Sequence, residues 1–193
     1  VQGTIETVDL TGVLKGHREV AAPDCYLRAT HPTRSDAALA ALARTADGAD
    51  ALALAHSLSA AVADAIAYRP GVTGAHTTAA EALALGEGVC QDHAHALIAV
   101  ARVRGVPGRY VSGYLFSDAD GQVHEAAHAW AELHIAGLGW VGFDPANRCC
   151  PDDRYIRLGS GFDAQDAAPI RGIARGAGRE AMDVTVAIQQ ASQ

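Results

Sequence analysis

The chain has 193 residues, and its 15 Lys and Arg against 22 Asp and Glu give a formal net charge of −7. That length suits one domain, and 49% apolar with 19% charged residues excludes an intrinsically disordered chain. The acidic balance and the lack of clustered Lys and Arg argue against a nucleic-acid binder. No run approaches the ~20 apolar residues that span a bilayer, and the cysteines are too sparse for a disulfide framework. We therefore expect a cytoplasmic protein that binds neither membranes nor nucleic acids.

The first part of the chain predicts irregular structure followed by helices. Strand-like residues from Thr4 to Leu10 are followed by glycine and proline breaks, so we assign residues 1–32 to edge strands and loop. This segment could belong to a longer β segment upstream, and residues 33–193 would form the main domain. Alanine-rich segments with N-cap residues and with glycine or proline stops predict helices over residues 35–46, 50–68 and 78–85.

The second half of the chain changes from helical to strand periodicity. An apolar stretch after Cys90 predicts a buried helix of about four turns, which Gly105 and Pro107 end. Strand patterns follow over residues 109–116, 128–135, 139–143 and 182–188. Helices first and antiparallel strands afterwards predict an α+β fold.

Cys90 is the candidate nucleophile because it lies at or just before the start of that buried helix. A free thiol has a pKa near ~8.5, so little of it is thiolate, the nucleophilic form, at neutral pH. A helix N-terminus carries partial positive charge and unpaired N–H groups, which favour the anion. The same amides can face a developing oxyanion. Taken alone, however, a single cysteine is more often a small buried hydrophobe.

The two strands near residues 128 and 144 offer a partner for that cysteine. A three-residue connection between them would pair residue 135 with residue 139 and place His128 diagonally across from Asp144 on one face. A loop of two or four residues would place them on opposite faces, because a one-residue slip turns every side chain over. In the first register, Asp144 can orient the His128 ring while His128 exchanges a proton with Cys90.

Four phrases in one order resemble the bacterial transglutaminase-like superfamily. They cover residues 88–95, 105–114, 128–132 and 139–145. The resemblance implies a papain-like α+β core in which N-terminal helices, with the nucleophile helix, pack on an antiparallel sheet. It also implies that Cys90 is the nucleophile, His128 the general base and acid, and Asp144 the residue that orients His128.

The chain also departs from the family pattern. Related sequences usually carry a Gly-Arg-Asp-Tyr phrase where this chain has residues 159–163, which puts a substrate contact in question. Papain-like proteases place a glutamine six residues before the nucleophile, and here that position is Ala84. A side-chain oxyanion donor must then come from elsewhere, and Tyr68 and Gln91 are the candidates. We assign both to substrate binding together with Trp130, which could line a substrate groove or pack in the core.

Other interpretations of these residues stay open. Cys90, His93 and His95 could bind zinc, but His95 points elsewhere on a helix and no second ligand pair accompanies them, so we expect no metal. The vicinal Cys149 and Cys150 would form a strained disulfide, which favours two free thiols. A catalytically inactive domain of this fold could also serve as a binding scaffold.

The expected reaction is attack of a cysteine on an amide bond of a peptide or protein substrate through a thioester intermediate. An amine acceptor would complete acyl transfer, and water would complete hydrolysis. The sequence leaves the two open, because the outcome depends on how the site excludes water. We expect no cofactor, and no carboxylate-dense loop supports calcium.

Overall fold

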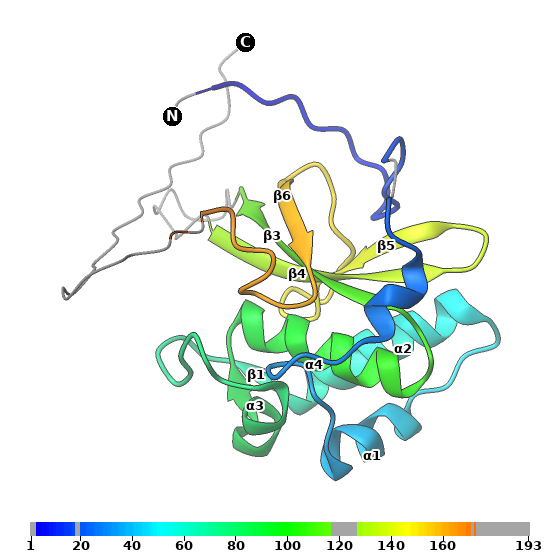
Figure 1. Ribbon diagram of the computed structural model, residues 1–193, viewed down its shortest axis with the longest axis vertical. Helices are drawn as coiled ribbons and strands as arrows, with labels where there is room; N and C mark the ends of the chain where they lie inside the picture. The colour runs from blue at the N-terminus through cyan, green and yellow to red at the C-terminus, as the bar shows by residue number, and fades with distance from the viewer. Residues whose placement is uncertain (1–2, 18–19, 117–126, 171, 173–193) are drawn as a thin grey trace.

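The computed structural model describes residues 3–17, 20–116, 127–170 and 172, and it has two layers. Helices cover one side of a four-stranded antiparallel sheet (Figure 1). The helices are the short 3₁₀ helix η1 (Pro23–Leu27), α1 (Ala37–Thr45), α2 (Ala51–Ala65), α3 (Ala79–Leu85) and α4 (Cys90–Val103). Among the described residues, none of these helices is long and apolar enough to cross a bilayer.

The sheet has the strand order β5-β4-β3-β6, and each neighbouring pair is antiparallel. Its strands are β3 (Gly108–Leu115), β4 (Ala127–Ile135), β5 (Gly139–Phe143) and β6 (Tyr155–Gly161). The strands β1 (Ala67–Tyr68) and β2 (Glu87–Gly88) form a separate parallel pair of two residues each. Strand β2 ends two residues before Cys90, the first residue of α4. The predicted α+β class, with the nucleophile helix on an antiparallel sheet, is confirmed.

Helix α4 is the central element of the core. Ten consecutive residues, from Asp92 to Ala101, are buried, because α4 lies between the other helices and strands β3 and β4. Alanines keep it narrow enough to be covered on all sides, while Leu97 and Ile98 are fully buried. Burying one such side chain contributes roughly 1.5–3 kcal/mol, so the packing fixes the helix that begins at Cys90.

The structure contains the predicted helices, and one of them, α2, ends earlier than predicted. Thr78 and Glu81 make the expected capping box at the start of α3, and Gly86 ends that helix with a φ of 71°. Helix α2 stops at Ala65 rather than near Tyr68, because the chain turns extended at Ile66. The next residues pair with β2 instead of continuing the helix.

The two ends of the sheet differ from the sequence expectation. Within residues 3–17, the predicted strand over 4–10 has no strand partner, and pairing occurs at Val13, which bridges to Val141 of β5. Strand β6 has no counterpart in the sequence analysis, because it is an edge strand with two glycines and a half-exposed face. The strand predicted over 182–188 lies outside the described residues, and the domain boundary at residue 32 stays a prediction.

Candidate active site

Cys90 is the first residue of α4, and the turn before it is held by a buried carboxylate. Oδ2 of Asp92 accepts hydrogen bonds from the Val89 amide at 2.8 Å and from Oγ1 of Thr73 at 2.6 Å. A Cβ at Gly88 would lie 2.8 Å from that same oxygen, so glycine is required there. The first amides of a helix have no intrahelical acceptor, which leaves the N–H groups of Cys90 and Gln91 directed outward.

The two histidines near Cys90 are held inside the protein. The buried ring of His93 has one nitrogen 2.9 Å from the Val89 carbonyl oxygen and the other 2.9 Å from that of Ile66. Nε2 of His95 accepts a hydrogen bond from the Ala164 amide at 3.1 Å, and burial lowers the pKa of His95 to about 4. His93 thus ties the start of α4 to the end of α2.

Strands β4 and β5 bring His128 and Asp144 together. Ile135 pairs with Gly139 and Ala131 with Phe143, which confirms the register predicted for a three-residue connection. Both side chains then project from the same face of the sheet, and Nε2 of His128 lies 2.6 Å from Oδ2 of Asp144.

The Asp144 carboxylate is fully buried and accepts more than one hydrogen bond. Oδ2 receives the Asn147 side-chain amide at 2.7 Å and the Tyr155 hydroxyl at 2.8 Å, in addition to His128. Sequence reasoning missed both Asn147 and Tyr155. Asn147 has a local signal, because it follows Asp144 by three residues and its backbone amide lies 3.3 Å from Oδ1 of Asp144, as in an Asx-type turn. Tyr155 has none, because it arrives from β6.

The hairpin that carries Asp144 and Asn147 is closed at its base and attached to α2. Asp144 and Cys149 exchange two backbone hydrogen bonds, of 2.8 and 3.2 Å. Arg148, at a left-handed φ of 54°, donates to Oδ1 of Asp64 at 2.7 Å and to the Ala63 carbonyl oxygen at 2.9 Å. We call residues 144–149 the Asp144 hairpin.

The charges of this group reinforce one another. Burial lowers the pKa of His128, but its hydrogen bonds with Asp144 and Cys90 outweigh burial and raise that pKa to about 9. Burial raises the pKa of Asp144, but hydrogen bonds from His128, Asn147 and Tyr155 leave it below its ordinary value. Since Asp144 holds Nε2 of His128, Nδ1 is the ring nitrogen left to exchange a proton with the Cys90 sulfur. The arrangement suits a thiol nucleophile with a charged imidazole.

The three predicted substrate-binding residues take different positions. Tyr68 is 55% exposed on β1, and its ring lies 6.3 Å from that of His93. The side-chain amide of Gln91 donates to the Ala75 carbonyl oxygen at 3.3 Å. Trp130 is 2% exposed and belongs to the small core cluster with Val111 and Tyr155. Trp130 is therefore a packing residue beside His128, and contact of any of the three with substrate stays a prediction.

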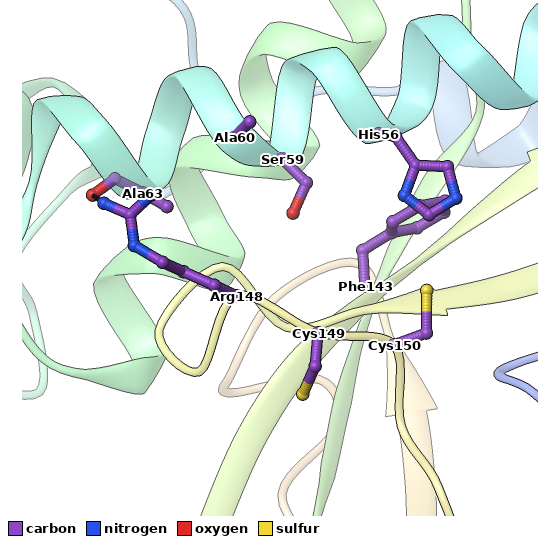
Figure 2. Close-up of a pocket in the computed structure, with 8 residues that line it drawn as sticks. All are labelled: His56, Ser59, Ala60, Ala63, Phe143, Arg148, Cys149 and Cys150. Atoms are coloured by element: carbon purple, nitrogen blue, oxygen red, sulfur yellow. Dashed lines mark hydrogen bonds between the residues drawn. The ribbon is translucent and has the colours of Figure 1, made fainter.

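The vicinal cysteines are free thiols with different environments. Figure 2 shows that the Cys150 sulfur lies on the same side as His56 and Phe143. Cys150, His56 and Phe143 line a cavity of about 330 Å³ against α2. The Cys149 sulfur points away from α2 and lies 3.3 Å from the Tyr155 hydroxyl. Among the described residues, no group of three or more His, Cys, Asp or Glu is arranged to hold a metal ion.

Comparisons with known proteins identify relatives by sequence and by structure. An uncharacterised protein of Mycobacterium leprae is 42% identical over 125 residues, which cover 63% of this chain and 44% of that protein. An uncharacterised protein of Mycobacterium tuberculosis is 42% identical over 115 residues, covering 55% of this chain and 37% of that protein. The crystal structure of a “putative cysteine protease” from Cytophaga hutchinsonii superposes with a TM-score of 0.66 at 26% identity, covering 84% of this chain and 55% of that one.

The matched region spans less than half the length of the mycobacterial relatives and about half of the Cytophaga protein. The family model described as the transglutaminase-like superfamily matches residues 38–145, which is more than half of the chain and contains Cys90, His128 and Asp144. The chain belongs to the transglutaminase-like superfamily.

Proposed function

We propose that this protein is a cysteine enzyme that acts on amide bonds, with Cys90 as nucleophile, His128 as proton carrier and Asp144 as the residue that orients His128. One observation carries the proposal: the 2.6 Å contact between His128 and the buried Asp144, on a ring whose pKa Cys90 at the tip of α4 also helps to raise. A helix N-terminus favours the thiolate, and the neighbouring imidazolium favours it further.

The reaction would proceed in two halves. The Cys90 thiolate attacks the amide carbonyl carbon, and the backbone N–H groups of Cys90 and Gln91 would stabilise the oxyanion. The His128 imidazolium gives its proton to the amide nitrogen as the C–N bond breaks, leaving a thioester and a free amine. Neutral His128 then takes a proton from the incoming water or amine, which attacks the thioester and releases the thiolate.

Acyl transfer and hydrolysis differ only in the second nucleophile. The proposed substrate is a peptide or protein that presents an amide, as a glutamine side chain or as a peptide bond. A panel of glutamine-containing peptides, incubated with a labelled primary amine, separates the outcomes. Ammonia release with amine incorporation indicates a transferase, ammonia alone an amidase, and new peptide termini a protease.

Alkylation of Cys90 tests the enzyme against the alternative of an inactive scaffold. Iodoacetamide labelling near neutral pH, followed by peptide mass mapping, compares Cys90 with the exposed Cys25 in the same molecule. We expect Cys90 to react at least about tenfold faster than Cys25, since a cysteine beside an imidazole at a helix N-terminus is the more reactive nucleophile. His128→Ala should remove the difference. Labelling of Cys90 no faster than Cys25 in the unaltered protein contradicts the proposal.

A further inference from the structure

Tyr155 occupies a position behind the proposed catalytic residues that no sequence motif indicates. Its ring makes edge contacts with Trp130, at 5.4 Å between centroids, and with His128, at 5.8 Å. The side chain is 7% exposed, and its hydroxyl lies 2.8 Å from Oδ2 of Asp144. The ring is therefore fixed by packing, and the hydroxyl is aimed at the carboxylate that holds His128.

The direction of each hydrogen bond follows from the number of protons available. A phenol has one O–H, and the ionised carboxylate of Asp144 can only accept, so Tyr155 donates to Asp144. The 3.3 Å contact between the Tyr155 oxygen and the Cys149 sulfur must then be donated by the thiol. Burial raises the pKa of Cys149, which keeps that proton in place at neutral pH. A chain of hydrogen bonds thus leads from Cys149 through Tyr155 and Asp144 to His128.

We propose that Tyr155 is a positioning residue that tunes His128: its hydroxyl, oriented by the Cys149 thiol, shares the charge of Asp144 and limits how tightly Asp144 holds the His128 proton. This inference rests on the proposed function, in which His128 gives up and regains that proton in each cycle. A carboxylate oxygen that already accepts hydrogen bonds from Tyr155 and Asn147 attracts an imidazolium less strongly than one that accepts none.

The charged and titratable groups around this chain of hydrogen bonds set the direction in which the His128 midpoint is expected to move. Those that face His128 or Tyr155 are Cys90 from α4, Asp144 and Cys149 from the hairpin, and Arg154. Cys149 itself lies near Asp152 and Arg154. Tyr155→Phe keeps the ring contacts and removes only the hydroxyl. The charge of Asp144 is then less dispersed, the imidazolium is favoured, and the titration midpoint of His128 should rise.

Histidine NMR measures this effect directly in the whole protein. With ¹³C-labelled histidine, and His128→Gln to assign the resonance, the midpoint of His128 in the unaltered protein should lie near the pKa of about 9. In Tyr155→Phe we expect it to rise by about half to one unit, the scale of one hydrogen bond to a charged group. Cys149→Ala should give a smaller rise, and Cys149→Ser should restore most of it, because serine keeps a donor.

Tyr26→Phe is the matched control, since Tyr26 packs on Trp140 and Phe162 away from His128. The titration midpoint of His128 in Tyr26→Phe should equal that in the unaltered protein. A merely structural Tyr155 would lower the melting temperature and leave the His128 midpoint unchanged, and that result overturns the inference. Two other results would also contradict the proposed chain of hydrogen bonds. One is a lower His128 midpoint in Tyr155→Phe. The other is a raised His128 midpoint in Tyr155→Phe together with an unchanged one in Cys149→Ala.

The labelling experiment separates this inference from the proposed function. If Cys90 reacts no faster than Cys25 in the unaltered protein, the proposed function fails and the catalytic meaning of Tyr155 fails with it. If Cys90 is reactive and the midpoint in Tyr155→Phe is unchanged, only the role of Tyr155 fails. A reactive Cys90 together with a raised midpoint supports both.

Discussion

Gly113 offers a sharp test of how the sheet supports the candidate site. It pairs with His128 on one side and with Arg157 on the other, at an irregularity in the pairing of β3 with β6. A Cβ there would lie 2.3 Å from the Ile156 carbonyl oxygen and 2.5 Å from the Trp130 ring. Overpacking of this kind costs ~1–3 kcal/mol, and the upper end applies because the nearest atom is backbone rather than a flexible side chain.

Gly113→Ala should therefore lower the melting temperature by roughly 6–12 °C, taking ~3 kcal/mol and ~2–4 °C per kcal/mol for a chain of this length. It should also slow iodoacetamide labelling of Cys90 by about tenfold or more, because Trp130 would be displaced toward His128. Gly159→Ala is the matched control, since its Cβ would meet only the Ala167 carbonyl oxygen at 3.6 Å. Equal melting temperatures for the two variants would refute the packing argument.

Three more predictions concern pH, the turn before the nucleophile and the carboxylate. The pKa of His128 rises from 6.5 to about 9 on folding, so its contribution of about 3 kcal/mol to the free energy of unfolding is complete below pH 6.5 and is lost as pH rises toward 9. Urea melts should show that His128→Gln loses less stability over this pH range than the unaltered protein does. Gly88→Ala should slow labelling of Cys90 several-fold and lower stability by ~1–3 kcal/mol, because the new methyl group meets the Asp92 carboxylate; labelling at the unaltered rate would contradict this. Asp144→Asn should lower the His128 midpoint in an NMR titration by about two units or more, because the imidazolium loses its counter-charge, and an unchanged midpoint would show that Asp144 does not act on the ring.

Local sequence signals predicted the parts of the fold that local chemistry determines. The Thr78–Glu81 capping box and Gly86 mark both ends of α3 through contacts between residues close in sequence. The register of β4 and β5 follows from a three-residue connection, and that register alone placed His128 and Asp144 on one face. Long apolar periodicity likewise indicated α4, since a helix buried on every side tolerates few polar residues.

The remainder depends on contacts between distant residues. Tyr155 reaches Asp144 only because β6 pairs with β3, and no pattern within residues 155–161 specifies that edge position. The stop of α2 at Ala65 likewise results from pairing with β2, which overrides helix propensity in residues 66–68. Trp130 shares its strand face with the polar residues His128 and Glu132, and its burial depends on Gly113 of the neighbouring strand, which leaves room for the ring.

The attachment of the Asp144 hairpin has a consequence for heat inactivation. Cys90 sits on the most deeply enclosed helix, so its surroundings should persist until the entire molecule melts. The Asp144 hairpin, by contrast, is tethered to α2 through Arg148, whose ion pair with Asp64 is largely solvent-exposed and contributes little. Warming should therefore release the carboxylate from the imidazole several degrees before cooperative denaturation, so that reactivity at the sulfur fades while circular dichroism still reports a folded protein.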